Sequence, residues 1–462
     1  MSRTSFARTL VLLGCAGALI AGCDSGTGSA PGPSSAQPPS AGHGEDLGYH
    51  GPALPGLEAQ PIAHLVNITF GAGKPYVVGD SFAFVTFKGG ADGDRSGSTP
   101  ATVTFYDAIT GRKTATADVP LWDLHAPQVG ESGGAPAIFL HGTETRESDG
   151  LSRTKKVEHQ VGFDSSGRKV SDLAWDSGDD RVAVAGWTAT KATNDHLTRE
   201  ELTVYAADGA ARLSLPADHG AITAVAPVLD IIAGDIALVR HTREGRTGAE
   251  HYLAAYDLAR PGAPLWTSDT TRPQAATNPD ASVSFLSRGT IGLIYPAGSG
   301  KATVAVQDVR TGAVKGATPA IDKYPGLRDS SVGEADNAGS GAAVLALTHA
   351  SSGHGSVAVS LADGHVLWQQ TGDQEGFAPD VVVGGTVYGT SAQSPGRGKG
   401  DAARPSLALD LATGRVQEKS LTTAPIAATD SGYAIVPEIG DDTSGEDAGA
   451  KGSYWIFRAR QG

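Results

Sequence analysis

A short turn signature recurs about every fifty residues along most of this 462-residue chain, and a fixed period of this length predicts a repeat architecture. The signature first occurs as Tyr106-Asp107-Ala108-Ile109-Thr110-Gly111. The last copy, the eighth, runs into Gly462, the final residue of the sequence. We therefore expect eight similar units stacked on one another, with the last unit completed by a segment from elsewhere in the chain.

Each signature follows a segment with apolar residues at alternate positions, which is the period of a half-buried β-strand. These segments are 101–107, 158–164, 201–207, 251–257, 302–308, 355–361, 405–411 and 453–459. A second such strand lies upstream in every unit, at 81–87, 135–142, 181–187, 235–241, 290–296, 342–348, 386–392 and 432–438. Glycines between the strands can supply the positive φ that tight hairpins need.

An innermost strand precedes this pair and an outer strand follows it, so each unit predicts a four-stranded antiparallel meander. Four strands repeated eight times predict an all-β, eight-bladed β-propeller over residues 62–462. The eighth unit has only three strands, whereas the strand pattern at 64–70 has no partner in the first unit. We expect 64–70 to complete the last blade and close the ring; the alternative is a seven-bladed ring with an appendage.

Several units resemble the pyrroloquinoline-quinone (PQQ) repeat, notably YDLARPGAPLW (256–266), SLADGHVLW (360–368) and LDLATGRV (409–416). The resemblance implies a propeller, and the family includes both quinoprotein dehydrogenases and non-enzymatic lipoproteins. Those dehydrogenases use adjacent cysteines beside the cofactor, calcium ligands and a catalytic aspartate. The only cysteines of this chain are Cys15 and Cys23, and no residue aligns with the other two features. We therefore expect no catalytic, cofactor-binding or metal-binding residues, with PQQ or calcium as the alternative.

The N-terminus has the pattern of an export signal. Arg3 and Arg8 precede an apolar stretch over 10–20, and Ile20-Ala21-Gly22-Cys23 follows. This sequence resembles the bacterial lipobox, which implies that 1–22 is a signal peptide and that Cys23 carries a diacylglycerol anchor in the lipid bilayer. The alternative is an ordinary signal peptide with an incidental cysteine. Residues 23–61, rich in Gly, Ser and Pro, predict a disordered tether to an extracytoplasmic domain at the cell membrane.

The formal charge of −14 argues against nucleic acid as a partner.

Individual sequence motifs give little support for a catalytic or metal site. Ser132 within Gly130–Gly134 matches GxSxG, but that pattern needs a strand-to-helix turn. Gly298-Ser299-Gly300-Lys301 lacks the hydroxyl residue of a P-loop. Two acidic segments, 92–97 and 441–447, contain oxygen ligands suited to weak calcium binding. The thirteen histidines show no HExxH spacing, so the sequence predicts no zinc site.

The connections between second and third strands emerge on one face of a propeller, and function resides in loops on rigid scaffolds. In this sequence the long connections belong to blades seven, eight, one, two and three, which are neighbours in a closed ring. They are 393–404, 439–452, 88–100, 143–157 and 188–200. We expect a protein or cell-wall ligand to bind this arc, although loops of this kind can also be solvated decoration. The sequence thus favours an anchored binding scaffold over a PQQ- or calcium-dependent oxidoreductase, a channel hydrolase or an envelope sensor.

Overall fold

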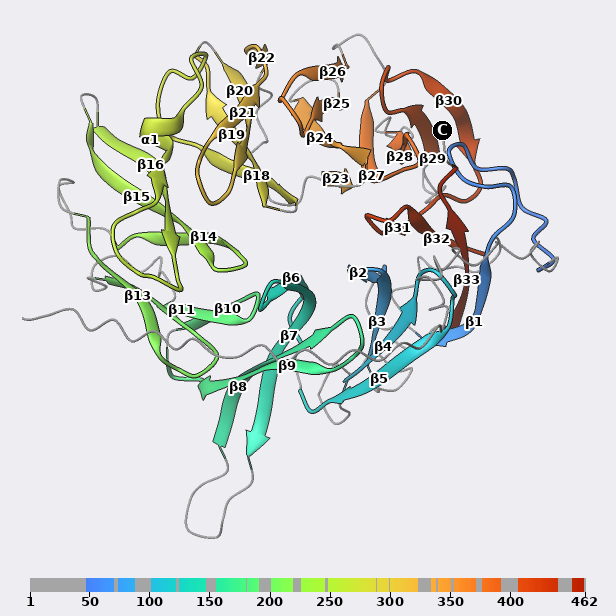
Figure 1. Cartoon of the computed structure of the whole chain (residues 1–462), viewed down its shortest axis with the longest axis horizontal. Helices are drawn as coiled ribbons and strands as arrows, with labels where there is room; N and C mark the ends of the chain where they lie inside the picture. Colours follow the sequence, from blue (N-terminus) through green and yellow to red (C-terminus); the bar gives the residue numbers. More distant parts are fainter. Residues whose placement is uncertain are drawn as a thin grey trace, which may run out of the picture. The chain divides into compact units, whose positions relative to one another are not determined.

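Eight four-stranded antiparallel sheets are arranged as blades around a ring, so the protein is an all-β propeller (Figure 1). The chain divides into two units, Met1–Gly44 and Glu45–Gly462, and every residue described below belongs to the second. The computed structural model describes residues 47–69, 74–87, 101–121, 124–146, 155–179, 181–190, 201–218, 226–245, 248–287, 289–298, 300–322, 334–337, 340–349, 353–370, 376–391, 406–438 and 451–460. None of the helical segments in these ranges has the length and apolar character needed to cross a membrane.

The first four blades follow the chain in order, each running from the centre of the ring outward (Figure 1). Blade one contains β2 (Tyr76–Val78), β3 (Ser81–Phe87), β4 (Ala101–Asp107) and β5 (Lys113–Val119). Blade two contains β6 (Gln128–Ser132), β7 (Ala135–Arg146), β8 (Lys155–Asp164) and β9 (Lys169–Asp176). Blade three contains β10 (Arg181–Val184), β11 (Trp187–Thr190), β12 (Glu201–Tyr205) and β13 (Ala211–Pro216). Blade four contains β14 (Val228–Ala233), β15 (Ile236–Gly245), β16 (Gly248–Asp257) and β17 (Trp266–Thr267), followed by the short helix α1 (Ser268–Thr271).

The next three blades repeat the same meander. Blade five contains β18 (Ser282–Ser287), β19 (Thr290–Pro296), β20 (Lys301–Asp308) and β21 (Val314–Ala317), and β22 (Ile321–Asp322) also pairs with β20. Blade six contains β23 (Glu334–Asn337), β24 (Ala342–His349), β25 (Gly353–Ser360) and β26 (Val366–Gln369). Blade seven contains β27 (Phe377–Val383), β28 (Thr386–Ser391), β29 (Ser406–Asp410) and β30 (Val416–Leu421).

The eighth blade takes its outer strand from the other end of the chain. β31 (Ala427–Ala428), β32 (Tyr433–Pro437) and β33 (Lys451–Arg458) form three strands, and β1 (Ala63–Thr69) pairs antiparallel with β33 as the fourth. Their register places Leu65 opposite Tyr454 and Ile68 opposite Gly452. The predicted closing strand at 64–70 is thereby confirmed, and the seven-bladed alternative is wrong.

Residues 47–61, which the sequence assigns to the tether, pack on blades seven and eight. The Tyr49 ring lies edge-on to Trp455 and Phe457, with ring centroids 5.5 and 5.0 Å apart. Leu54 and Leu57 are buried in the core cluster shared by these two blades. The apolar side chains just before β1 therefore fasten the start of the propeller to its last blades.

Blade three differs from the sequence prediction by one strand. The segment 181–187 reads as a single second strand, but the structure divides it into β10 and β11. The hairpin between them is formed by Ala185 and Gly186, whose φ angles are 42° and 89°. Two residues with positive φ form the tight turn that a two-residue hairpin requires. Because the first of them is an alanine inside an apolar run, the sequence shows no turn signal there.

The recurring turn signature has a clear structural basis. In the first copy, Asp107 Oδ1 accepts hydrogen bonds from Thr110 N–H at 2.7 Å and from Thr110 Oγ1 at 2.6 Å. Gly111, with a φ of 66°, donates its N–H to the Asp107 carbonyl. An aspartate side chain that binds the backbone ahead of it stabilises a turn, and glycine supplies the positive φ. The same bonds recur in Asp308–Thr311–Gly312 and Asp410–Thr413–Gly414.

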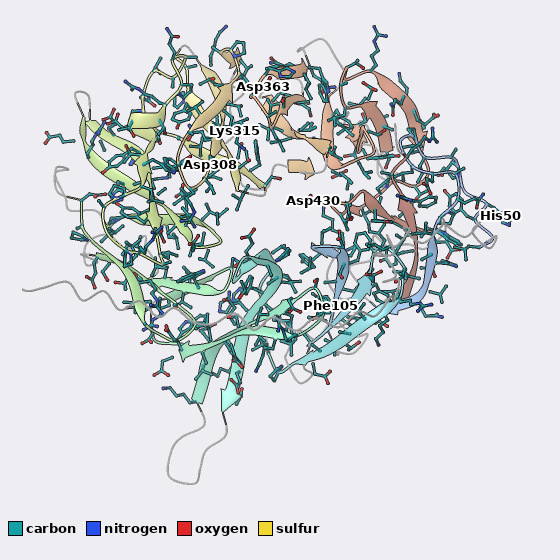
Figure 2. The ribbon with its side chains drawn as sticks, in the orientation of Figure 1. His50, Phe105, Asp308, Lys315, Asp363 and Asp430 are labelled. Carbon is teal, nitrogen blue, oxygen red and sulfur yellow. The ribbon has the colours of Figure 1, made fainter. Side chains whose placement is uncertain are left out.

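Apolar side chains fill the spaces between neighbouring blades. Seven of the eight interfaces contain a cluster of buried apolar residues, those between blades one and two, three and four, four and five, five and six, six and seven, seven and eight, and eight and one. Phe105, within blade one in Figure 2, belongs to the first of these and is fully buried. In the described part of the chain, the interface between blades two and three has no such cluster.

Two tryptophans link neighbouring blades through specific contacts. Trp266 of blade four donates its Nε1–H to the carbonyl of Val309 in blade five at 2.9 Å. Gly312 lies directly against this indole, because a Cβ atom there would be 2.4 Å from Trp266 Cγ. Trp368 of blade six makes the equivalent bond to the carbonyl of Leu411 in blade seven at 2.8 Å.

Candidate functional site

The antiparallel meander gives the ring two unlike ends. Turns between first and second strands, and between third and fourth strands, lie at one end, which we call the turn end. Connections between second and third strands lie at the other, the loop end. Between strands, the loop-end connections span 88–100, 147–154, 191–200, 392–405 and 438–450 in blades one, two, three, seven and eight. In blades four, five and six they span only 246–247, 297–300 and 350–352.

The predicted long loops fall at the loop end, with corrected boundaries in three cases. Residues 143–146 and 155–157 belong to β7 and β8, so the predicted loop 143–157 shortens to 147–154 because the two strands stay paired as a long hairpin. Residues 188–190 of the predicted loop 188–200 belong to β11, and 451–452 of 439–452 belong to β33. The loops 88–100 and 393–404, like the remainders of the other three, lie outside the described residues.

Two of the sequence motifs have geometries that exclude the chemistry they suggest. Ser132 ends β6 and is followed by a Gly133–Gly134 turn into β7, a strand-to-strand hairpin rather than a nucleophile elbow. Gly298 lies in the turn between β19 and β20 and accepts the Lys301 N–H on its carbonyl, so no helix follows for a phosphate to bind. The acidic segments 92–97 and 441–447, and Cys23, lie outside the described residues.

A cavity of about 1630 Å³ opens at the centre of the turn end. It is lined by first strands and turns of blades one to five and eight, and Asp308 and Asp430, both labelled in Figure 2, are among its lining residues. Several of the carboxylates that line it accept hydrogen bonds that stabilise the fold. Asp107 and Asp308 hold their turns, and Asp80 accepts a hydrogen bond from Ser431 Oγ at 2.5 Å.

Arg310 is the one arginine lining this cavity in the described part of the chain, and its guanidinium is paired with carboxylates. Its guanidinium donates to Asp235, and to Asp257 Oδ2 at 3.3 Å. Burial tends to raise the pKa of Asp257, but hydrogen bonds from the Ala259 and Arg260 N–H groups outweigh it and lower the pKa below 3.8. The contacts of Arg310 therefore join the turns of blades four and five, and they indicate a structural role for this arginine.

An Asp–His–Tyr relay lies in blade four. His241 Nδ1 contacts Asp218 Oδ1 at 2.9 Å, and its Nε2 contacts the Tyr256 hydroxyl at 2.9 Å. Such a chain resembles the carboxylate–imidazole–hydroxyl order of hydrolases. However, His241 and Tyr256 are both buried, and burial raises the pKa of Tyr256 to about 12. The hydroxyl therefore stays protonated and inaccessible, and the relay cross-links the blade.

The interface between blades two and three combines apolar and polar residues. Where blade four presents Leu253 to its neighbour, blade two presents Gln160, whose Oε1 accepts the Gly186 N–H at 3.0 Å. Buried polar atoms of blade two that find no hydrogen-bond partner among the described residues include Gln160 Nε2, Ser171 Oγ and Trp175 Nε1. Burying polar groups without partners is unfavourable, so these atoms lower the stability of this interface.

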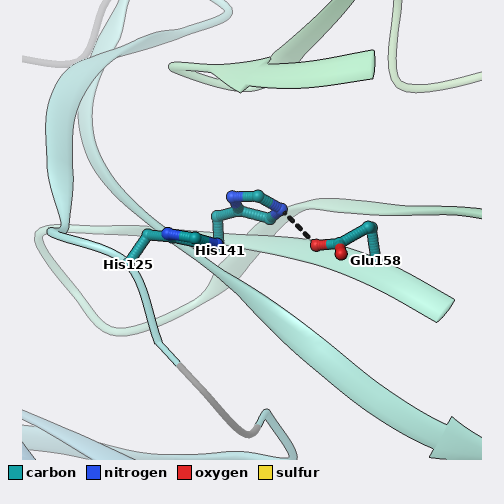
Figure 3. A group of neighbouring side chains, drawn as sticks. All are labelled: His125, His141 and Glu158. Carbon is teal, nitrogen blue, oxygen red and sulfur yellow. Dashed lines mark hydrogen bonds and ion pairs between the residues drawn. The ribbon is translucent and has the colours of Figure 1, made fainter. Parts of the chain in front are cut away.

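A cluster of two histidines and one glutamate lies on the same side of blade two (Figure 3). His141 on β7 contacts Glu158 on β8, with 2.9 Å between Nε2 and Oε2. His125, in the connection from blade one, stacks on His141 with ring centroids 4.6 Å apart. One donor atom from each of the three residues lies within 4.8 Å of the others.

The surroundings of the cluster hold its residues in place. Trp175 on β9 stacks on the other side of His141, with ring centroids 5.3 Å apart. The His125 N–H donates to the His141 carbonyl at 2.9 Å. Burial lowers the pKa of His141 below 6.5, His125 lowers it further, and Glu158 opposes both. Burial therefore favours the neutral form of the His141 imidazole.

The sequence prediction missed this cluster because its members are not close in sequence. His141 and Glu158 meet only because the β7–β8 register places Thr143 opposite Glu158 and Gln160 opposite His141. His125 reaches them from outside the hairpin. No spacing rule such as HExxH applies to ligands on neighbouring strands, and only the register could reveal them.

The fold and the turns define the class of this protein as an eight-bladed β-propeller. No family model and no curated protein sequence matches the chain. Among solved structures, it is similar to BamB from Moraxella catarrhalis, with 13% identity, 87% of this chain and 98% of that chain covered, and a TM-score of 0.41. It is also similar to the quinohemoprotein alcohol dehydrogenase from Comamonas testosteroni, with 12% identity, coverages of 86% and 75%, and a TM-score of 0.37. A computationally designed protein, Ika8, matches with 12% identity, coverages of 86% and 100%, and a TM-score of 0.41.

With TM-scores below 0.5, none of these likenesses assigns a function to this chain. The fit of a quinone cofactor can be judged from the residues themselves. Both cysteines precede residue 24, so the propeller cannot supply the adjacent cysteine pair of the quinoprotein dehydrogenases. The one arginine lining the central cavity in the described ranges is engaged by Asp235 and Asp257. The described residues of the turn end therefore supply neither that cysteine pair nor an uncommitted arginine for PQQ.

Proposed function

We propose that this chain is a lipid-anchored, extracytoplasmic binding scaffold of the bacterial cell envelope. In this proposal Cys23 carries the lipid, the segment that follows acts as a tether, and the propeller presents its loop end to a protein or cell-wall ligand. The chain acts without a catalytic site of its own. It thus combines a membrane anchor with a rigid binding surface.

The observation that carries the proposal is the uneven distribution of loop-end connections. Five contiguous blades have connections of eight to fourteen residues, whereas the other three have two to four. A two-residue hairpin suffices to join second and third strands, as β15 and β16 of blade four demonstrate. Longer connections are therefore not required by the fold, and their grouping on one arc supports a binding surface.

The turn end offers a weaker case for binding. The carboxylates of Asp107, Asp308 and Asp410 hold their own turns, and Arg310 joins blades four and five. Groups engaged in this way must break stabilising contacts before they can bind a ligand. This contrast favours the loop end as the partner-binding side.

Loop replacement tests the proposal. In one variant 147–154 is replaced by a two-residue turn like that of the β15–β16 hairpin, and in a second variant 438–450 is shortened in the same way. The expected result is loss of the partners co-purified from detergent-solubilised envelopes, with the urea unfolding midpoint retained. As a matched control, Gly133–Gly134 at the turn end is replaced by Asn–Gly, which keeps the two-residue hairpin. Partner recovery equal to that of the native chain in both loop variants would refute the proposal.

The same purified chain separates this proposal from a PQQ-dependent oxidoreductase. We expect incubation with PQQ and calcium to leave no quinone absorption bound to the protein after gel filtration. Stoichiometric quinone absorption together with dye-linked alcohol oxidation would favour the enzyme instead.

A further inference from the structure

We propose that His125, His141 and Glu158 form a zinc-type metal site with three protein ligands and one open coordination position. Figure 3 shows the three side chains together. Because Leu140 and Val161 pack on blade one, the alternating residues His141 and Glu158 lie on the face toward blade three. The site is independent of the proposed scaffold function, since a scaffold needs no metal.

The donor set is the first support. Two imidazole nitrogens and one carboxylate oxygen are ligands that zinc prefers, and three protein ligands with a bound water are typical of open zinc sites. Donor atoms on a tetrahedral zinc are about 3.3 Å apart when its bonds are about 2.0 Å long. His141 Nε2 and Glu158 Oε2 are 2.9 Å apart, and all three donors lie within 4.8 Å. Because the His125 side chain is exposed, a rotation of its ring can close the remaining separation.

The polar character of the interface is the second support. Seven inter-blade spaces contain a cluster of buried apolar residues. In this one, His141, Glu158 and Gln160 lie on the same face of blade two as the buried Phe139, which packs against Gly186. Trp175, whose ring stacks on His141, has a buried Nε1 without a partner among the described residues. Other inter-blade spaces of the same fold are filled with aliphatic residues. Polar residues in this space therefore add nothing to stability. A bound metal would compensate the half-buried imidazole and carboxylate with strong bonds.

The packing around His141 is the third support. Trp175 stacks on the His141 ring, with ring centroids 5.3 Å apart, and so orients its plane. The two strands that carry His141 and Glu158 are paired over ten residue pairs, so the ligand positions are set by sheet register. Metal sites need ligands held in place before the metal arrives, and strands provide this better than loops.

Another histidine on the same hairpin lies among ion pairs on the opposite face. His159 points to the opposite side of β8 and contacts Asp172 Oδ1 through Nε2 at 2.5 Å. Its partner is itself bound by Lys169. The carboxylate of this pair is thus shared with a cation, whereas Glu158 contacts only the imidazole of His141 in the described hydrogen bonds.

The test is metal binding by the full chain, purified without a histidine tag and treated with chelator. Isothermal titration with Zn²⁺ is expected to show saturable binding that His141→Gln and Glu158→Gln each weaken by about 100-fold or more. His365→Gln removes an exposed histidine of a turn-end hairpin and is expected to leave the affinity unchanged. Urea midpoints establish that all variants remain folded. Equal affinity in the native chain and both ligand variants, or no saturable binding, would overturn the proposal.

Two further readouts address the geometry. Co²⁺ in place of zinc is expected to give the visible bands of a four-coordinate ion, and these bands should be lost in Glu158→Gln. Added azide is expected to shift them, since an open position accepts an exogenous anion. Bands unchanged by azide would overturn the open position. Affinity should also fall as the pH drops, because metal ligands must be deprotonated to bind.

Discussion

Trp266 in blade four donates its indole N–H to the backbone carbonyl of Val309 in blade five, at 2.9 Å. The bond closes the outer edge of the interface and places the indole against Gly312. Gly312, the recurring turn glycine of this blade, therefore has two structural roles. It adopts a positive φ, and it leaves room for the tryptophan of the preceding blade.

We expect Gly312→Ala to lower the free energy of unfolding by roughly 3 kcal/mol, combining left-handed backbone strain with overpacking. The new Cβ would lie 2.4 Å from Trp266 Cγ, at a φ of 68°. Gly209→Ala is the matched control, because its φ is 76° and nothing lies within 4 Å. That variant should lose only about 1 kcal/mol. Urea unfolding of both chains measures the difference, and equal losses would show that the tryptophan contact is unimportant.

Ring closure by β1 predicts a sharp contrast between two adjacent residues. Leu65 is 4% exposed and packs in the core between blades eight and one, whereas Val66 is 52% exposed. Leu65→Ala should lower the free energy of unfolding by about 3 kcal/mol, and Val66→Ala should change it by less than about 0.5 kcal/mol. Similar effects of the two substitutions in urea unfolding would contradict a closing role for this strand.

Acid should weaken the turns that aspartates hold. Hydrogen bonding from the Thr311 N–H is the main reason that the pKa of Asp308 lies below 3.8. A carboxyl with a lowered folded-state pKa stabilises the protein above its unfolded pKa and loses this effect as the pH falls through the folded value. Stability of the native chain should therefore decline below about pH 4, and less steeply in Asp308→Asn. Urea midpoints between pH 7 and about 3 measure the slopes; identical slopes would assign the pH dependence to other groups.

The anchoring prediction concerns Cys23, with Cys15 as its natural control. We expect Cys23→Ala to move the exported chain from the detergent phase to the aqueous phase, because the acyl chains supply the membrane affinity. Cys15→Ala should remain in the detergent phase. Mass spectrometry of the native N-terminal peptide should detect the added diacylglycerol. Detergent partitioning of Cys23→Ala like that of the native chain would contradict a lipid anchor at this residue.

Blade number and ring closure could be predicted from the sequence because both depend on local signals. Alternating apolar residues specify strands, and the Asp107–Thr110–Gly111 pattern specifies turns through bonds within five residues. The prediction was wrong where that signal is absent, as at Ala185, which adopts a φ of 42° without being a glycine.

The histidine cluster could not be predicted in the same way. His141 and Glu158 come together through the register of a hairpin whose strands continue past the expected loop boundary. Charged residues in the sequence 143–157 suggest a solvated loop, but along paired strands they can alternate between two faces. Contacts that depend on register and on a third segment, here His125, need the folded structure.

The most direct test of the scaffold proposal is site-specific photo-crosslinking in intact cells. A photoreactive amino acid is placed at Gly150 or Ala448 for the loop end, and at Gly133 or Asp363 for the turn end. The proposal predicts crosslinked partners from the loop-end positions and none from the turn-end positions. Crosslinks confined to Gly133 and Asp363, or equal at both ends, would contradict it.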